Sequence, residues 1–379
     1  MANSLITPSI VAREALMILE NNLVAANVFH RGHTEEFTGA KVGDTITVRG
    51  PASFTAQEFT TTTTTQNITE ASTSLVLEKH FDVTVGVTAK DWTLELDQFR
   101  ARVIAPAMAA IAQKVDAYAL GKAVEIYNHV GTAGDPPDSL ADLVAVDKKL
   151  NDLKVPTANR FAIIDSQAKN DILANVTQVL QAEQRADGGQ ALTRAQIGEV
   201  LGISWIMDQN VATHTVGTLA NGSGMLAKIN NASVAVGDLT VPMDDTSLTG
   251  TVVEGDLFTV AGDTQQYAVT ALATAAGNAL ASVSFFPAAK VAWADNAVVT
   301  FVDTDHQLNI AGDARGLTLA VVPLELPAGA ARAEYIADRG LGVRIVYDYS
   351  ASTKTDTISF DVLCGAKVQD GELLTRVLG

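Results

Sequence analysis

The longest uninterrupted helical pattern in the chain covers residues 91–128. Its apolar side chains recur every three or four positions, which is the spacing of one helix face: Trp92, Leu96, Phe99, Val103, Ala107, Ile111, Val115 and Tyr118. Ile104 and Met108 widen this stripe, so layers could pack on two sides. Thr88 and Asp91 have the spacing of an N-terminal capping box. At 1.5 Å per residue the helix would span roughly 57 Å, and we expect it to be the spine of the protein.

Pro106 interrupts this pattern. Proline lacks a backbone N–H, and its ring clashes with the preceding helical turn. We therefore predict a kink or a local unwinding of the helix between residues 102 and 106.

A second helical pattern covers residues 10–28 and predicts an amphipathic arm. Thr7 and Pro8 precede it as a capping residue and a favoured first helical residue. Two adjacent faces carry the apolar side chains, which are Val11, Ala15, Ile18, Leu16, Leu19 and Leu23. Glu14 and Glu20 lie on the opposite, polar side.

Alternation of apolar and polar residues predicts strands over residues 41–49 and 74–88. Between them, residues 50–73 include Phe54, Phe59 and a run of six threonines (60–65), with almost no charge. A two-stranded arm of this kind is at best marginally stable alone in water. We predict that it lies on another subunit; the alternative is a flexible surface loop.

Strand and helix patterns alternate after residue 131, which is typical of an α/β domain. The predicted elements are helix 140–153, strand 160–165, helix 166–180 capped by Ser166, helix 193–200 and strand 203–208. The sheet is expected to resume at residues 317–324. The last predicted strands are 334–338 and a hairpin of 342–349 with 356–365.

The interval 212–305 has a different composition. Only nine charged residues occur between residues 215 and 302, and short β-like runs alternate with Gly-Asp and Gly-Asn turns. The runs are 232–236, 257–260, 266–272, 281–286 and 297–302. We interpret the interval as an inserted all-β domain, either a small barrel or a sandwich.

Composition places the chain among ordinary globular proteins. With 379 residues, 47% hydrophobic and 18% charged, it can form two or three domains with real cores. No run approaches the roughly 18 apolar residues of a membrane span, and the N-terminus does not resemble a signal peptide. We expect no membrane contact and a cytoplasmic site of synthesis. The net charge of -17 argues against DNA binding through a basic surface.

Candidate catalytic, cofactor and metal sites are not found in the sequence. It has no P-loop, no dinucleotide-binding glycine motif and no nucleophile elbow. His30 and His33 have no third ligand at a recognisable spacing, and Asp244 with Asp245 lies in a turn composition. Four histidines have no triad-like partners nearby, namely His80, His129, His214 and His306. We expect no enzyme, no cofactor and no metal.

Cys364 lies in the alternating pattern of a strand. A single cysteine excludes an internal disulfide and a cysteine-based zinc site. We expect a buried, unreactive thiol rather than a nucleophile.

The opening segment, MANSLITPSIVAREALMILENNLV, closely resembles the N-terminus of the coat proteins of short-tailed Salmonella phages. The order of the later elements is also similar to that family's version of the HK97 capsid fold. It comprises KVGDTITVRGPASFTA before the hairpin, the spine helix, the α/β domain with its insertion, LAVVPL and the last hairpin. The resemblance covers the whole chain.

The resemblance implies an α+β, HK97-like fold with five parts. They are an N-arm (1–40), an extended loop (41–90), a peripheral domain with the spine helix (91–130 and 333–379), an axial domain (131–211 and 306–332) and the inserted β domain (212–305). It assigns Arg49, Phe54 and Phe59 to a subunit interface. We further assign Glu14 and Glu20 to a contact with a scaffolding protein.

The function implied is that of a major capsid protein. Copies would form the pentamers and hexamers of an icosahedral shell, assembled in the bacterial host cytoplasm and found in the virion. The expected partners are a scaffolding protein, a portal and double-stranded DNA that is enclosed without specific binding. Two alternatives stay open, an encapsulin-like protein compartment and, with less support, an α/β enzyme.

Overall fold

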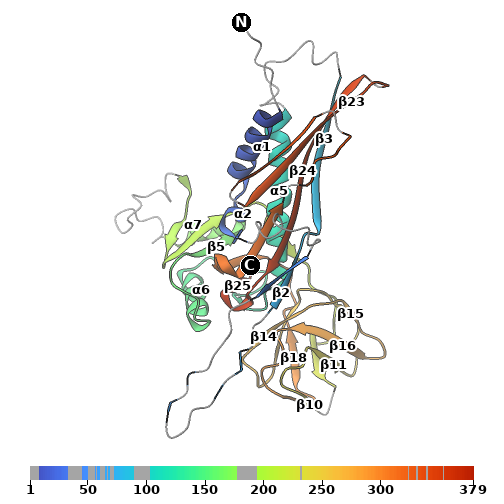
Figure 1. Cartoon of the computed structure of the whole chain (residues 1–379). Helices are drawn as coiled ribbons and strands as arrows, with labels where there is room; N and C mark the ends of the chain where they lie inside the picture. The colour runs from blue at the N-terminus through green and yellow to red at the C-terminus, as the bar shows by residue number, and fades with distance from the viewer. Residues whose placement is uncertain are drawn as a thin grey trace. The chain divides into compact units, whose positions relative to one another are not determined.

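The protein is described by a computed structural model. The described residues are 8–32, 45–49, 56, 58–59, 65, 67–68, 72–88, 103–176, 194–230, 233–322, 324–329, 332–338, 340–352 and 354–379. The chain divides into two compact units (Figure 1). Unit 1 consists of Met1–Ala119 and Leu317–Asp370, and unit 2 consists of Leu120–Gly316 and Gly371–Gly379.

The N-terminal arm of unit 1 is two helices, α1 (Pro8–Asn22) and α2 (Ala25–Val28). The buried face of α1 is formed by Ala12, Ala15, Leu16 and Leu19. The predicted single helix is therefore interrupted at Leu23 and Val24. At this break the Asp116 carboxylate accepts the N–H groups of Val24 and Ala26, each at 2.8 Å.

The described part of the spine helix is α5 (Ala105–Gly121), preceded by Val103 and Ile104 in a π-helical turn. Pro106 is the second residue of α5 and closely follows this π-helical turn. The kink or local unwinding was predicted between residues 102 and 106; of these, Val103 and Ile104 form the π-helical turn, while Arg102 and the rest of 89–102 lie outside the described residues. The helix ends earlier than residue 128: it continues as the 3₁₀ turn η2 (Lys122–Glu125), and Ile126 is extended.

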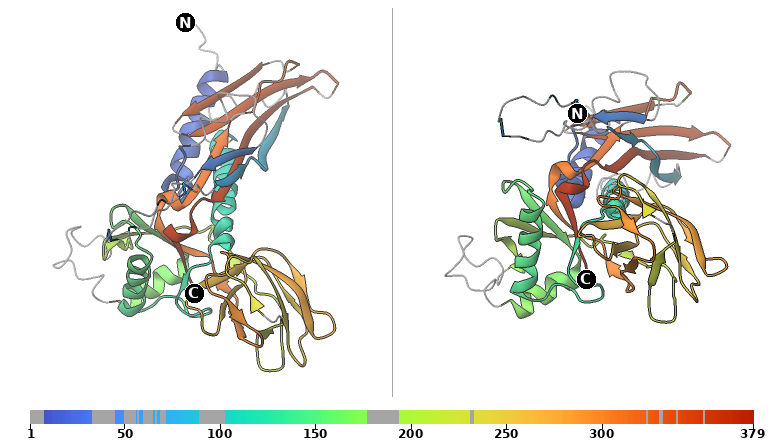
Figure 2. Two further views of the ribbon diagram at one scale, coloured as in Figure 1. Left: turned by 60° about the horizontal axis from the view of Figure 1, so that its bottom comes forward. Right: turned by 90° about the horizontal axis from the view of Figure 1, so that it is seen from below.

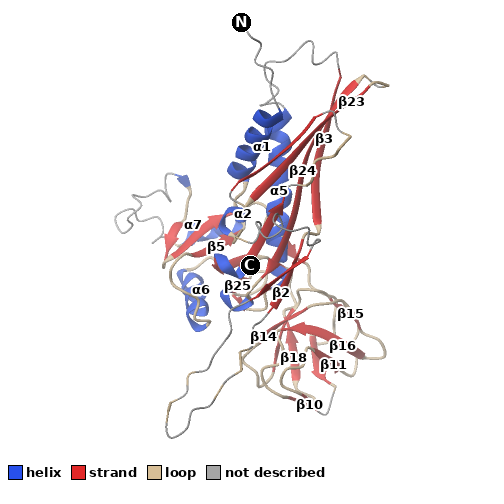
Figure 3. Ribbon diagram, in the orientation of Figure 1, coloured by secondary structure: helices blue, strands red, loops and turns tan. Residues whose placement is uncertain are grey.

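The sheet of unit 1 has the order β21 (Leu317–Val322), β24 (Thr355–Val368), β23 (Leu341–Ser350) and β22 (Arg332–Asp338). A further strand, β3 (Lys79–Thr88), pairs with β24, and every pairing is antiparallel. Helix α1 packs against β22 and β23 (Figure 3). The predicted hairpin near the end of the chain is β23 and β24.

The placement of strand β21 differs from the prediction that it continues the α/β sheet. Its register with β24 runs from Leu317 opposite Val368 to Val322 opposite Leu363. All six residues of β21 are buried, so the strand needs cover on both faces. The 14-residue strand β24 extends past its pairing with β23 and supplies the neighbour that β21 requires.

The predicted strand 74–88 is two strands, β2 (Ser72–Val76) and β3, separated at Leu77 and Glu78. Strand β2 pairs antiparallel with β1 (Thr45–Arg49). Gly365 of β24 explains how β2 approaches so closely, because a Cβ at this position would lie 2.0 Å from the Val76 carbonyl oxygen.

Unit 2 contains a mixed sheet. Its order is β4 (His129–Val130), β25 (Leu374–Val377), β20 (Asn309–Asp313), β5 (Arg160–Ile164), β7 (Ile203–Met207) and β6 (Gly198–Val200). Helices α6 (Leu140–Asp152) and α7 (Ser166–Asn175) pack on it through Leu143, Leu150 and Ile172. We predicted residues 91–130 and 333–379 as one peripheral domain, whereas β4 and β25 belong to this second sheet.

Two local predictions in unit 2 are wrong. The cap of α7 is Asp165, whose carboxylate accepts from the N–H groups of Gln167 and Ala168, and not Ser166. Residues 198–200 form strand β6 rather than a helix. Leu201 and Gly202 have positive φ values of 56° and 74°, and such a two-residue turn folds β6 back onto β7.

The interval 212–305 forms a closed barrel (Figure 2). The strand order is β11 (Thr240–Asp244), β16 (Ala279–Phe286), β14 (Gln266–Val269), β13 (Leu257–Val260), β18 (Val298–Phe301) and β9 (Leu226–Ile229). Of the two architectures left open by the sequence, the barrel is the one observed. Its core is aromatic, with Phe258, Tyr267, Phe285, Trp293 and Phe301 in ring contact.

Short strand pairs complete unit 2. They are β8 (Thr213–His214) with β19 (His306–Gln307), β10 (Ser233–Val234) with β17 (Trp293–Ala294), and β12 (Thr251–Val252) with β15 (Ala273–Thr274). The 3₁₀ turns η4 (Ala314–Gly316) and η5 (Gly371–Leu373) follow β20 and precede β25.

Candidate functional site

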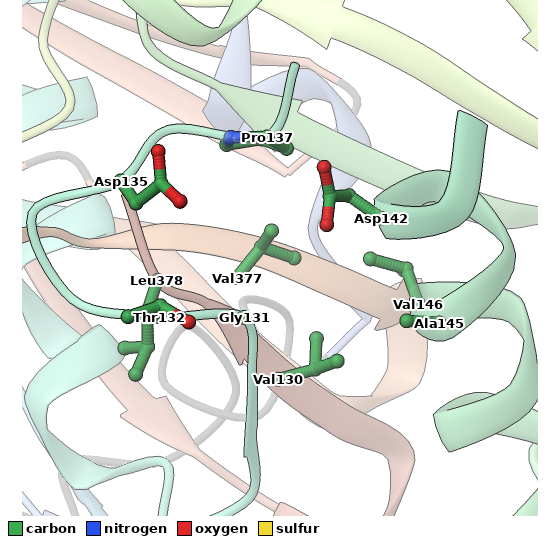
Figure 4. A pocket seen from close by; sticks show the side chains of 10 residues that line it. All are labelled: Val130, Gly131, Thr132, Asp135, Pro137, Asp142, Ala145, Val146, Val377 and Leu378. Carbon is green, nitrogen blue, oxygen red and sulfur yellow. The ribbon is translucent and has the colours of Figure 1, made fainter. Parts of the chain in front are cut away.

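A small cavity in unit 2 lies between α6, β25 and residues 130–137 (Figure 4). The carboxylates of Asp135 and Asp142 flank it, and Pro137 covers it. Asp142 already accepts from Ser139, from the backbone N–H at 3.0 Å and from Oγ at 2.7 Å, as the capping box of α6. The cavity measures about 40 Å³, close to the volume of one water molecule, and is too small for a substrate.

A larger cavity of about 390 Å³ lies beside β6 and β7. Its charged side chains are Lys169 and Arg194, and Trp205 provides an apolar wall. None of the described residues that line it is an Asp, Glu, His, Cys or Ser. In the described ranges, no group of three such metal-ligating side chains could hold an ion, and no helix is long and apolar enough to cross a membrane.

The loop between β1 and β2 begins from a rigid base in unit 1. Val48 of β1 and Leu75 of β2 are 7% and 1% exposed, and they pack with Ala320 of β21. Leu77 adds to this cluster. Strands β1 and β2 therefore pair in a defined register at the base of the loop, and this base packs against β21.

Beyond this base, the described residues of the loop are exposed. Phe59 is 68% exposed and Ile68 is 73% exposed, and Glu58 and Asn67 beside them are exposed as well. The backbone of Arg49 ends β1, while its side chain and Phe54 lie outside the described residues. Among the described residues of this loop, Phe59 and Ile68 are therefore large apolar side chains without cover in the single chain.

The residues assigned to a scaffolding contact lie on α1. Glu14 and Glu20 are half-buried there, while Arg13, next to Glu14, and Met17, between the two, are exposed. Met17 is 45% exposed, so the outward face of α1 is partly apolar and not purely acidic.

A buried polar cluster in unit 2 was missed by the sequence reasoning. His214 does not stand alone: its Nε2 lies 3.0 Å from Oδ1 of Asp256. Asp256 is fully buried and also accepts the N–H groups of Gly217 and Val253. The ring of His306 lies against that of His214, with centroids 5.2 Å apart.

Arg376 of β25 completes the cluster. It is fully buried and donates through Nη1 to the Gly255 carbonyl at 2.8 Å and through Nη2 to the Val124 carbonyl. Burial lowers the pKa of Arg376 to about 9, and the nearby Asp256 opposes this shift. The guanidinium therefore remains charged at neutral pH.

His306 and His129 are held neutral by their surroundings. Burial lowers the pKa of each to about 4, and Arg376 adds to the effect on both. The sequence did offer a signal for the cluster, since His214 and His306 lie at the two boundaries of the inserted interval. Among the described residues, no Ser or Cys is hydrogen-bonded to the ring of His214 or of His306.

Comparison with solved structures finds the same fold in a phage chain. A chain of Mycobacterium phage Che8 matches with a TM-score of 0.52 at 12% sequence identity, over 94% of this chain and 90% of that chain. At this identity the likeness concerns the fold, and it confirms the predicted α+β, HK97-like fold class.

Two weaker matches have similar coverage. A chain of the capsid of the Cyanophage P-SCSP1u matches at 12% identity with a TM-score of 0.44, over 89% of this chain and 83% of that chain. A chain of the mature capsid of bacteriophage PhiM1 matches at 9% identity with a TM-score of 0.45, over 88% and 82%. No family model matches the sequence, and no curated protein matches it.

Proposed function

We propose that this chain is the major capsid protein of a tailed phage. Many copies assemble into an icosahedral shell around a double-stranded DNA genome, first in the bacterial cytoplasm and finally in the virion. The observation that carries the proposal is the fold, which matches a phage chain over 94% of this sequence and therefore over both units. The net charge of -17 fits a wall that encloses DNA without adhering to it.

Within this class we infer a coat protein of the short-tailed Salmonella phage type. The N-terminal motif of residues 1–24 supports this inference, and so does the β barrel between residues 212 and 305. The proposed parts are the N-arm, the extended loop, the peripheral and axial domains and the inserted domain. Because β25 pairs with β20 and β4, we now place residues 371–379 in the axial domain.

The extended loop is the proposed subunit interface, with Arg49, Phe54 and Phe59 as its contact residues. Phe59 is 68% exposed in the single chain, and burying a phenylalanine contributes about 1.5–3 kcal/mol. A neighbouring copy of this chain supplies the cover. An interface of the usual size buries about 1,600 Å² in total, so the loop would be one part of it.

The double variant Phe54→Ser with Phe59→Ser tests the proposal. The wild-type chain is expected to form closed shells by negative-stain electron microscopy and sedimentation velocity. The variant is expected to stay as a small species with an unchanged circular dichroism spectrum, because Phe59 is exposed on the loop and belongs to neither core. Leu272→Ser, at a 66% exposed position on the barrel, is the matched control and should assemble normally.

Two outcomes would contradict these proposals. If the Phe54 and Phe59 double variant formed normal shells, the proposal that the loop is a subunit interface would be wrong. If the wild-type chain stayed monomeric under all assembly conditions, the proposed capsid function itself would be wrong. Particles from the native source should contain DNA and a portal; a protein cargo in their place would favour the encapsulin-like alternative.

We also propose that α1 meets a basic segment of a scaffolding protein through Glu14 and Glu20. The double variant Glu14→Lys with Glu20→Lys is expected to abolish co-sedimentation of the scaffold with shells, because it reverses the charge of the contact. Asp152→Lys, at a side chain 59% exposed on α6, is the control for charge alone. Unchanged co-sedimentation of the Glu14 and Glu20 variant would refute the contact.

A further inference from the structure

The barrel joins the rest of unit 2 through two segments that pair with each other. Strands β8 and β19 place His214 opposite His306 and Thr213 opposite Gln307. We refer to this pair as the neck. The two imidazole rings of the neck are 7% and 1% exposed, and they contact each other at an interplanar angle of 55°.

Charged groups from several elements face the neck. Asp256, in the turn before β13, contacts His214, and Arg376 of β25 links the Gly255 and Val124 carbonyls. His129 of β4 and Lys149 of α6 lie nearby, joined through Gln266, which bonds the backbone of His129 and accepts from Lys149. Asp305 accepts the N–H of Val216.

The hydrogen bonds of His306 define its protonation state. Nδ1 lies 3.1 Å from the Thr304 carbonyl oxygen, which can only accept, so Nδ1 carries the proton. Nε2 is buried and has no hydrogen-bond partner among the described residues. A proton added at Nε2 would be a buried donor without an acceptor, and it would place a second cation beside Arg376.

We propose that His306 is an acid-sensitive latch, whose protonation opens the neck and reversibly releases the barrel from its contact with β25. While His306 is neutral, the negative charge of the Asp256 carboxylate offsets the positive charge of the Arg376 guanidinium. A proton on His306 adds an uncompensated positive charge to this buried cluster. The proposal rests on the fold of unit 2 and not on the proposed capsid function.

The barrel stays folded when the neck opens, because most of its core is separate; Leu257 and Ala268, which pack with Tyr127 and Leu378, are the exception. Its aromatic cluster lies within the closed ring of strands. The buried Tyr267 and Trp293 also find their acceptor within the barrel, since the half-buried Asp263 accepts from Tyr267 Oη at 2.6 Å and from Trp293 Nε1 at 3.0 Å. Opening is therefore a local event at the neck.

Amide hydrogen exchange of the full chain, measured between pH 7.5 and 4.5, tests the latch. The folded pKa of His306 is lowered to about 4 from 6.5, so neck protection is complete above pH 6.5 and is lost as the pH falls toward 4. With the ordinary pKa in the open state, the open fraction at pH 5 rises roughly 30-fold. Peptides covering 213–217, 304–308 and 374–378 should report this, whereas peptides from β13, β14 and β16 should stay protected.

His306→Gln is the test variant, because an amide can donate and accept but does not titrate in this range. It is expected to remove most of the pH response of the neck peptides. His80→Gln is the control, since His80 lies in unit 1 with its side chain 47% exposed, and it should leave the response unchanged. Any pH response of the neck peptides that remains is tested with His129→Gln, since His129 is the second histidine whose pKa is lowered.

A measurement on the wild-type chain covers the case in which His306→Gln fails to fold. Exchange at the imidazole C2 position, followed by mass spectrometry, gives the pKa of each histidine, and His306 should titrate well below 6. The latch is overturned if His306 titrates near 6.5. It is also overturned if the neck keeps its protection down to pH 4.5, if the barrel core opens at the same pH, or if a folded His306→Gln variant responds like wild type.

Discussion

Asp116 shows how one side chain holds the N-terminal arm of unit 1. It is 1% exposed on α5, and its two oxygens accept the N–H groups of Val24 and Ala26 at the start of α2. These donors have no partner within a helix as short as α2. The carboxylate therefore joins the end of the arm to the spine helix.

Asp116→Asn is expected to lower the free energy of unfolding by about 1.5–3 kcal/mol. The amide keeps one oxygen, but its NH₂ group faces a backbone N–H that also donates. Urea unfolding followed by circular dichroism measures the loss, and amide exchange at Val24 and Ala26 locates it. Asp152→Asn, which breaks an exposed pair with Lys148, should change the stability by less than about 0.5 kcal/mol. Equal losses in the two variants would contradict this role of Asp116.

The structural roles of some residues could be predicted from their sequence neighbours, and those of others could not. The helix start near Ser139 and the burial of Cys364 were expected and are observed, because both depend on neighbours a few positions away. The contact between His214 and Asp256 spans 42 residues and exists only once the barrel closes. No spacing rule in the sequence points to such a pair.

Among the elements, β25 is joined to two distant segments by a single side chain. The guanidinium of Arg376, on this strand, donates hydrogen bonds to one carbonyl group of η2 and to one in the turn before β13. Three segments distant in sequence are thereby joined by one fully buried cation. Its Nε has no partner among the described residues, so the two Nη bonds carry the contact.

Arg376→Met is expected to lower the free energy of unfolding of unit 2 by about 2–4 kcal/mol, because two buried carbonyl groups lose charge-assisted hydrogen bonds. Trp205 and Trp293 are both buried in unit 2 and report its unfolding by fluorescence. Arg315→Met is the control: that side chain is 62% exposed and pairs with Asp313, and its loss should cost at most about 1 kcal/mol. A similar small loss for Arg376→Met would show that the contact is dispensable.

Element types were predicted well where a pattern was long, and wrongly where a turn decided the outcome. Helices α1, α5 and α6 were expected, as were the long strands β3, β23 and β24. Residues 198–200 were expected to be helical, but the positive φ values of Leu201 and Gly202 make them a strand. Strand β21 was recognised as a strand, yet its partner β24 lies about fifty residues later, and periodicity does not specify partners.

At the scale of the whole molecule, the order of elements was informative because it resembled a known family. That order predicted the α+β, HK97-like fold class, which the likeness to a phage chain confirms. The assignment of Phe54, Phe59, Glu14 and Glu20 to contacts stays a prediction, since a single chain does not contain the surfaces that would cover them. Phe59 is exposed in the single chain, as a contact residue on this loop is expected to be.

The mixed sheet of unit 2 sets an order of events during synthesis. Among the described strands, β4 pairs with β25 alone, and Asn128 beside it bonds the Leu374 carbonyl, 246 residues later in the chain. At about 5–20 residues per second, a ribosome needs roughly 12–50 s to cover that interval. During this time β4 has no strand to pair with, so the sheet of unit 2 closes only after nearly all of the chain described here has been made.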